Sequence, residues 1–287
     1  MSVDVTSSGA QPFDPLRAIP RELAESAQAF ADEGREPAEP RDASSVILMR
    51  EGSRGPEVYL LRRHTQMAFA GGFYVFPGGG VDPRDFDPDA AWAGPSAAEW
   101  ARSLDCDESI ARALVCAAVR ETFEESGVLL AGPSADSVVG DTTGAEWEAD
   151  RVALEGRELS LTDFLVKRGL VLRTDLLRFW AHWVTPEWEP RRFDTRFFVA
   201  VLPEGQVARD VSTESDAVTW LPARDAVAAV QDQEMVMLPP TFVNCRDVAE
   251  HETAGLCMVA AGSRLPRVVR PVLTTDPDGT TRLDISG

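Results

Sequence analysis

The sequence predicts an α+β fold in which helices pack on the faces of a mixed β-sheet. Short runs of apolar and β-branched residues, typical of strands, recur along the chain between stretches of helical period. The two kinds of segment interleave without the strict alternation that an all-parallel sheet requires. The chain has 287 residues, 44% of them hydrophobic, which is enough for a sizeable core.

The N-terminal residues differ in composition from the rest of the chain. Residues 1–42 are rich in Pro, Ala and acidic residues, which is typical of an arm rather than of a core. A short helix over residues 21–31 is compatible with this composition. Ordered structure is expected from Ala43, so we predict a flexible N-terminal arm over residues 1–42 and one domain over residues 43–287.

The domain is expected to begin with two strands and a glycine-rich segment. The run SSVILM after Ala43 predicts a strand, and residues 58–63 (VYLLRR) predict its antiparallel partner. Residues 70–82 (AGGFYVFPGGGVD) follow, with three consecutive glycines. Residues 83–107 are polar and rich in Pro and Asp, so they are expected to form a loop or an insertion.

Residues 105–126 give the clearest helix signal in the chain. Asp105 followed by Glu108 is typical of a capping box at a helix start. The interior is rich in alanine, and Gly127 stands where glycine commonly ends a helix.

The remaining elements are predicted from pattern and composition. The stretch 132–173 is ambiguous, and its most helical part is residues 161–168. Strands are expected over residues 177–185 and 196–202, near 217–221 and over 268–273, and helices over 223–233 and within 241–254.

Charge and composition exclude several functional classes. Against 28 Lys and Arg stand 47 Asp and Glu, a net charge of −19, which repels nucleic-acid backbones and anionic membranes. No secretory signal or membrane-length apolar run is expected. The four cysteines lack the spacing of a zinc site, so free thiols in a reducing cytoplasm are expected.

Three glutamates near the end of the predicted helix suggest a cation site. At about 100° per residue, Glu121, Glu124 and Glu125 share one helix face, while Val119 and Phe123 lie opposite and can pack on a sheet. In a cleft, two such charges about 6 Å apart repel by about 3 kcal/mol. Mg²⁺ or Mn²⁺ would remove this repulsion and suits oxygen ligands. A solvated acidic helix end is the alternative.

The glycines and the glutamates together form a known pattern. FPGGGVD (76–82) precedes a helix that ends R-E-x-x-E-E-x-G, and the combination resembles the Nudix hydrolases, whose signature is G-x5-E-x7-R-E-U-x-E-E-x-G-U, with U apolar. Thr122 stands at an apolar position of the signature. The two halves are separated by an insertion of about the length of residues 83–107. The glutamate of the first half is replaced by Asp85, by Glu108 or by neither.

The resemblance implies a fold and a set of roles. The fold would be a Nudix-type α/β/α sandwich around a mixed β-sheet. Glu121, Glu124 and Glu125 would hold Mg²⁺ or Mn²⁺ against a diphosphate, Arg120 would orient a glutamate, and the Gly79 backbone would supply a carbonyl ligand. A water polarised by the metal would attack phosphorus.

Other candidate residues are supported by position alone. Arg62 and Arg63 end a strand just before the glycine loop, where either could bind a phosphate, or they form a surface pair. Glu214 lies where some Nudix enzymes carry a general base, or it is a plain loop residue. The three histidines are scattered and are expected to be structural.

The expected substrate is a nucleoside diphosphate linked to another moiety. The run LLRR, the split box and the aromatic–arginine stretch 182–198 are similar to the coenzyme A diphosphatase branch, so coenzyme A or acyl-CoA is favoured. The alternatives are ADP-ribose, NADH, a nucleotide sugar or an oxidised nucleotide, and a non-catalytic nucleotide-binding regulator. The insertion is expected to shape substrate entry, and the chain could form a homodimer.

Overall fold

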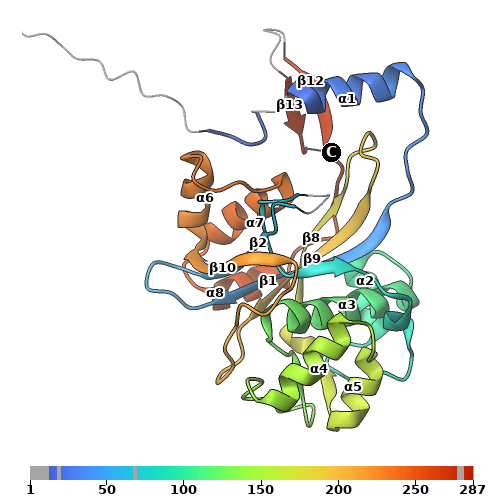
Figure 1. Cartoon of the computed structure of the whole chain (residues 1–287), viewed down its shortest axis with the longest axis vertical. Coiled ribbons are helices and arrows are strands. Elements are labelled where there is room, and N and C mark those ends of the chain that lie inside the picture. The colour runs from blue at the N-terminus through green and yellow to red at the C-terminus, as the bar shows by residue number, and fades with distance from the viewer. Residues whose placement is uncertain (1–12, 18–20, 67–69, 277–280, 287) are drawn as a thin grey trace, which may run out of the picture.

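The computed structural model describes residues 13–17, 21–66, 70–276 and 281–286, and a mixed sheet forms its centre (Figure 1). The strand order is β10–β2–β1–β9–β8–β11, and β3 and β4 pair with β2 and β1. These strands are β1 (Arg41–Arg50), β2 (Glu57–Arg63), β3 (Tyr74–Val75), β4 (Gly78–Gly80), β8 (Arg178–Val184), β9 (Phe193–Val201), β10 (Ser215–Pro222) and β11 (Val268–Val269).

Helices cover both faces of this sheet, as Figure 1 shows. The helices are α1 (Arg21–Asp32), α2 (Ala97–Leu104), α3 (Glu108–Ser126), α4 (Ala145–Glu155), α5 (Leu161–Arg168), α6 (Ala223–Gln231), α7 (Pro239–Ala249) and α8 (Ala254–Ala261), with short 3-10 turns η1 (Pro83–Phe86) and η2 (Thr174–Leu176). Smaller sheets join β5 (Trp92–Ala93), β6 (Ala131–Gly132) and β7 (Val171–Arg173), and β12 (Val272–Thr275) with β13 (Thr281–Asp284).

The central strands separate two hydrophobic cores because alternate side chains point to opposite faces. Val46 and Leu48 of β1 pack with α2 to α5, whereas Ile47 and Met49 pack with α6, α7 and α8. This arrangement is the α/β/α sandwich around a mixed sheet that the family resemblance implies.

Strand β1 brings the glycine segment beside α3. It runs parallel to β9 and antiparallel to both β2 and β4. On the α3 side, the Ser44 hydroxyl donates a hydrogen bond of 2.6 Å to the carbonyl of Leu114, which fixes the middle of α3 to the strand. The last turns of α3 therefore lie against β4.

Several expected elements form close to their predicted bounds. Helix α5 covers residues 161–168, α6 and α7 form where helices are expected, and β8, β9 and β10 match the three later strands within a few residues. Gly127 ends α3 with φ 71°, in the left-handed region where glycine is favoured. The first strand begins at Arg41, two residues before the predicted start.

The expectation for residues 83–107 is wrong in part, because η1, β5 and α2 form there. In α2, Trp100 and Leu104 are buried in the core shared with α3, so the segment contributes to packing. The predicted capping box is also wrong. Asp105 ends α2 in a left-handed conformation, and α3 starts after Asp107, whose side chain makes no cap hydrogen bond.

The elements that were not predicted include α4, α8, β6, β7 and β13. In the N-terminal region, α1 spans Arg21–Asp32, close to the expected helix, and Leu16 is buried where its carbonyl accepts a hydrogen bond from Leu283. The division between an arm and a domain stays a prediction. No helix in the described part of the chain is long and apolar enough to span a membrane.

Candidate active site

The glycine segment lets the α3 glutamates come unusually close to the sheet. The Gly78 amide donates a hydrogen bond of 2.7 Å to Glu125 Oε2. A Cβ at Gly78 would lie 2.4 Å from the Ser44 carbonyl oxygen, and one at Gly79 would lie 2.6 Å from Glu121 Oε1. No larger residue fits either position without displacing the strand or the carboxylate.

Helix α3 presents the predicted acidic face to this segment. Its opposite face is buried and includes Val119 and Phe123. Thr122, at an apolar position of the signature, is fully buried, and its hydroxyl donates a hydrogen bond of 2.7 Å to the Ala118 carbonyl. The hydroxyl is thus satisfied within the helix, and the departure from the signature leaves no unpaired polar group.

Arg120 lies at the centre of a buried ion-pair cluster. Its Nε and Nη2 donate to both oxygens of Asp85, at 3.0 and 2.9 Å. Its Nη1 donates to Glu121 at 2.7 Å and to Glu124 at 3.2 Å, and its Nη2 also reaches the Gly80 carbonyl at 3.1 Å. Arg120 is thus anchored to η1, to β4 and to its own helix.

Asp85, one of the candidates for the missing glutamate of the signature, is paired with Arg120. It is only 3% exposed and forms a bidentate pair with Arg120. Glu108 lies in the first turn of α3 and is exposed. Of the three alternatives left open by the sequence, the pairing with Arg120 favours Asp85.

Burial makes the three glutamates costly to ionise together. Burial raises the pKa of the Glu124 carboxyl to about 7, although the positive charge of Arg120 opposes the shift. Burial also raises the pKa of Glu121, again against Arg120. Burial and the negative charge of Glu121 raise the pKa of Glu125 well above its usual range. Such shifts mark a site with too much negative charge for its surroundings.

The three glutamates line one small cavity of about 120 Å³. The loop before β10, the glycine segment and the end of α4 supply its other walls. The remaining lining residues are Asp82, Arg84, Arg120, Leu154, Glu155, Arg157, Ser212 and Glu214. The structure therefore brings Glu214, predicted from its position in the sequence, to the same cavity as Glu121, Glu124 and Glu125.

A hydrogen-bond chain through α4 ties the Glu214 loop to α3. Arg151 donates from Nη1 to the Glu124 carbonyl at 2.7 Å and to Glu155 Oε2 at 2.9 Å. Glu155 Oε1 accepts from the amide and the hydroxyl of Thr213, at 3.0 and 2.6 Å. Glu214 follows directly, with its side chain 56% exposed.

Arg62 and Arg63 lie outside the lining of this cavity. Arg62 is paired with Asp216 at 2.6 Å, and Arg63 with Glu214 at 3.2 Å. Arg63 thus reaches the site through Glu214, whereas Arg62 faces a different carboxylate. Their proposed contact with substrate stays a prediction.

Sequence reasoning missed six lining residues, and four of these are charged: Asp82, Arg84, Glu155 and Arg157. Asp82 caps η1, and the hydrogen bond from the Arg84 side chain lowers its pKa to about 2. Asp82 ends the glycine segment and Arg84 lies two residues beyond it, which is a usable signal. Glu155 and Arg157 carry none, because only the packing of α4 brings them to the site.

The histidines and the aromatic–arginine stretch lie elsewhere. His182 is buried, with Nε2 at 2.5 Å from Asp194, and His251 packs edge-on against Trp180. Arg192 donates to the carbonyls of Thr185 and Ala38, so it holds the β8–β9 connection to the preceding segment.

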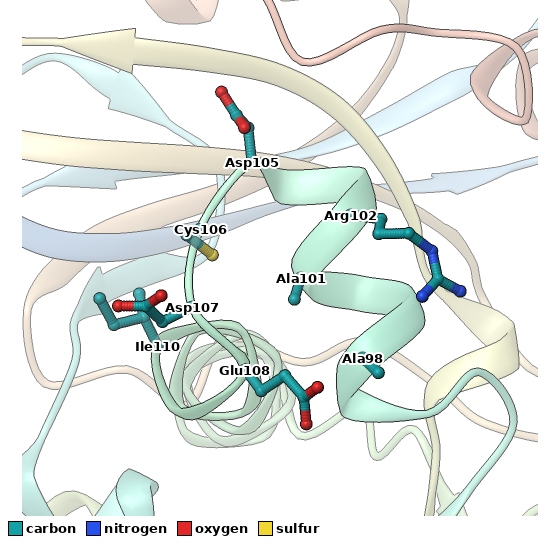
Figure 2. Close-up of a pocket in the computed structure, with 8 residues that line it drawn as sticks. All are labelled: Ala98, Ala101, Arg102, Asp105, Cys106, Asp107, Glu108 and Ile110. Atoms are coloured by element: carbon teal, nitrogen blue, oxygen red, sulfur yellow. The ribbon is translucent and has the colours of Figure 1, made fainter.

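A second and larger depression of about 640 Å³ opens between α2 and α3 (Figure 2). Figure 2 shows that its carboxylates, Asp105, Asp107 and Glu108, are spread around Cys106 rather than gathered. Burial raises the pKa of the Cys106 thiol, which disfavours the reactive thiolate. The smaller cavity holds the clustered charges and is the candidate active site.

Comparisons with known proteins show which family the chain belongs to. The family profile described as the NUDT19 Nudix domain matches residues 101–248, more than half of the chain. The acyl-coenzyme A diphosphatase NUDT19 of Homo sapiens is 27% identical and covers 85% of this chain and 78% of its own length. That of Gallus gallus is 26% identical and covers 72% and 67%.

A crystal structure of a Nudix hydrolase from Alicyclobacillus acidocaldarius is 29% identical, with a TM-score of 0.67. The match covers 80% of this chain and 98% of that one. Together with the glycine segment, the paired Arg120 and the three glutamates on α3, these matches show that the chain belongs to the Nudix hydrolases, in the family of the NUDT19 Nudix domain.

Proposed function

We propose that this Nudix hydrolase cleaves the diphosphate of a nucleoside diphosphate linked to another moiety, using Mg²⁺ or Mn²⁺. The observation that carries the proposal is the gathering of Glu121, Glu124, Glu125 and Glu214 around one cavity. Burial raises the pKa of each of the first three carboxyls, so a divalent cation would offset a real electrostatic cost.

The chemistry of the donor set fits such a cation. The groups are carboxylates, with the Gly79 backbone beside Glu121, and hard cations prefer oxygen ligands. Glu121 and Glu124 face Arg120, and Glu125 faces the Gly78 amide. Because these carboxylates are turned toward Arg120 and the Gly78 amide, no three acidic, His or Cys side chains of the described residues lie close enough together to hold a metal ion. A cation would compete with Arg120 for Glu121 and Glu124.

The residues of the chain have distinct proposed roles. When bound, the ion would polarise a phosphate oxygen and lower the pKa of an attacking water. Arg120 holds Glu121 and Glu124 in place, and the Gly78 amide fixes Glu125. Glu214 borders the cavity on a loop tied to α4, so we propose that it accepts the proton of the water.

Coenzyme A or an acyl-CoA is the proposed substrate, because relatives bear the name acyl-coenzyme A diphosphatase. Hydrolysis of coenzyme A would release adenosine 3′,5′-bisphosphate and 4′-phosphopantetheine. A cytoplasmic location is proposed on the ground that all four cysteines are free thiols. We also propose a homodimer, which gel filtration with light scattering would test.

A substrate panel tests the function. Coenzyme A, an acyl-CoA, ADP-ribose and NADH are incubated with Mg²⁺ or Mn²⁺, and the products are separated by chromatography. The expected result is cation-dependent cleavage, fastest for a coenzyme A substrate. Much faster cleavage of ADP-ribose or NADH would reject the substrate and keep the reaction. No cleavage of any compound, with nucleotide binding intact, would instead favour the non-catalytic regulator.

A further inference from the structure

The turn after α4 holds Arg157 in a conformation that arginine rarely adopts. Its φ is 61°, in the left-handed region that favours glycine. The turn is well fixed, because the amides of Arg157 and Leu159 donate to the carbonyls of Leu154 and Ala153. Arg84 strengthens it further by donating to the Arg157 carbonyl at 3.0 Å. The backbone of this turn therefore fixes the position of the Arg157 Cα and the direction in which its side chain leaves the chain.

A second turn in the molecule shows that this geometry does not need an arginine. After α6, Gln233 has φ 59°. The hydrogen bonds also match: Gln233 to Val230, and Glu234 and Met235 to Ala229, as Arg157 to Leu154, and Glu158 and Leu159 to Ala153. Gln233 is exposed and does not line the cavity of the candidate site. The same turn thus accepts glutamine, so the backbone conformation does not explain why an arginine stands at position 157.

The Arg157 side chain lines the candidate active site and is only weakly engaged there. The side chain is 79% exposed, and its Nε lies 3.8 Å from Asp82 Oδ2, a long ion pair. The other two lining arginines are closely bound. Arg120 pairs with Asp85 and with two glutamates of α3, and Arg84 pairs with Asp82 at 2.9 Å.

The cavity needs a positively charged side chain that can contact an anionic substrate. Its wall carries six carboxylates (Asp82, Glu121, Glu124, Glu125, Glu155 and Glu214), which repel a diphosphate. Arg62 and Arg63, the arginines selected from the sequence, are paired with Asp216 and Glu214 and do not line the cavity. Among the arginines that the structure describes around this cavity, Arg157 combines exposure with the weakest ion pair.

We propose that Arg157 binds a non-bridging phosphate oxygen of a nucleoside diphosphate at the rim of the cavity. It is then a substrate-binding residue, presented by a strained turn that Arg84 holds. The inference rests on the proposed function and deepens it by naming the group that receives the substrate's diphosphate. A guanidinium can contact phosphate through two parallel hydrogen bonds, which lysine cannot reproduce.

The test compares Arg157→Gly with Gln233→Gly, two variants that relieve the same backbone conformation. Binding of ADP in the presence of Mg²⁺ is measured by titration calorimetry, and thermal unfolding is measured in parallel. Both variants are expected to unfold at the wild-type temperature or above, because glycine suits a positive φ. Only Arg157→Gly is expected to weaken ADP binding, by about tenfold. Arg157→Lys is expected to restore part of the loss.

Each outcome decides the inference. Wild-type affinity for ADP in Arg157→Gly would overturn it, as would equal losses in the two glycine variants or no binding of ADP to the wild type. Wild-type protein that binds ADP through Arg157 yet cleaves no compound of the substrate panel would support the inference and reject the proposed function. The two failures are therefore distinguishable.

Discussion

The two helical layers on the sheet differ in what they bury. On one face, α3 and α4 bury Arg120, Glu124, Asp150 and Arg151 among apolar side chains. On the other face, the buried residues of α6, α7 and α8 are apolar except for the uncharged Thr241 and Asn244. Buried charge needs a partner to be tolerated. The charged layer has such partners, and it is the layer that lines the cavity.

The difference separates stability from chemistry. The α6–α8 layer can be altered at a cost in packing alone, because nothing buried there carries charge to the site. The α3 layer combines packing with a cluster whose charges are poorly solvated. We therefore expect substitutions on the two faces to affect different measurements, and the predictions below test that separation.

The largest effect on stability is expected on the uncharged face. Phe242 is 3% exposed within the core beneath α7, so Phe242→Ala should lower the free energy of unfolding by about 3–5 kcal/mol. Urea denaturation measures this, with Val259→Ala on the exposed side of α8 as the control. Turnover of the folded variant should stay close to that of the wild type, and a steep loss would erase the contrast between the faces.

The opposite pattern is expected for Glu125→Gln. The Gln amide oxygen can still accept the hydrogen bond from Gly78, and removing a charge that burial disfavours should leave stability unchanged or higher. Turnover should fall by about 10²–10³, the usual cost of losing one electrostatic partner of the transition state. Glu108→Gln, at the exposed start of the same helix, is the matched control. Wild-type turnover in both variants would contradict the proposed site.

A pH dependence should appear on the charged face when no divalent cation is present. Because the pKa of Glu124 is raised to about 7, the folded protein binds this proton more tightly than the unfolded chain does. Its contribution to stability is then present below about pH 4.5 and is lost as the pH rises through about 7, at most about 3 kcal/mol. Urea denaturation in EDTA at pH 5, 6, 7 and 8 measures it.

Glu124→Gln provides the comparison for that experiment. The difference in unfolding free energy between wild type and Glu124→Gln should fall as the pH rises over this range. Adding Mg²⁺ should stabilise the wild type more at pH 8 than at pH 5, where protons compete with the cation. A difference that does not vary with pH would show that Glu124 ionises normally.

The smallest effect is expected for Asp85→Asn. Arg120 would lose a charged bidentate partner but keep Glu121 and Glu124, so the free energy of unfolding should fall by about 1–3 kcal/mol. Turnover should fall less than in Glu125→Gln, because Asp85 acts through Arg120. Asp89→Asn, an exposed neighbour, is the control. No change in stability would mean that the ion pair only balances its own desolvation.

Local signals were sufficient where one element carries the information. The helical period places Glu121, Glu124 and Glu125 on one face, and the spacing of Arg120 and Glu124 allows their pairing, which the structure shows at 3.2 Å. A mixed sheet with helices on its faces also follows from the order and type of the segments, whereas the α/β/α sandwich followed from the family resemblance. Which of these residues catalyse stays a prediction, which the turnover of Glu125→Gln tests.

Contacts between distant segments could not be predicted in the same way. Asp85 and Arg120 are 35 residues apart, and only the docking of η1 on α3 joins them. Arg157 reaches the cavity because α4 packs beside α3, and no spacing in the sequence encodes that. The capping prediction failed for a related reason: Asp105 is suited to a helix start, yet its left-handed backbone ends α2 instead.

The direction of α3 adds a consequence to its acidic end. Peptide dipoles aligned along a helix place about half a negative elementary charge at its C-terminus. Glu121, Glu124 and Glu125 lie at that end, and the last turn of α3 contains no basic residue. The backbone therefore adds to the repulsion among the side chains. A cation at this end would neutralise the helix macrodipole as well as the carboxylates, so the last turn of α3 is the secondary structure that would gain most from its binding.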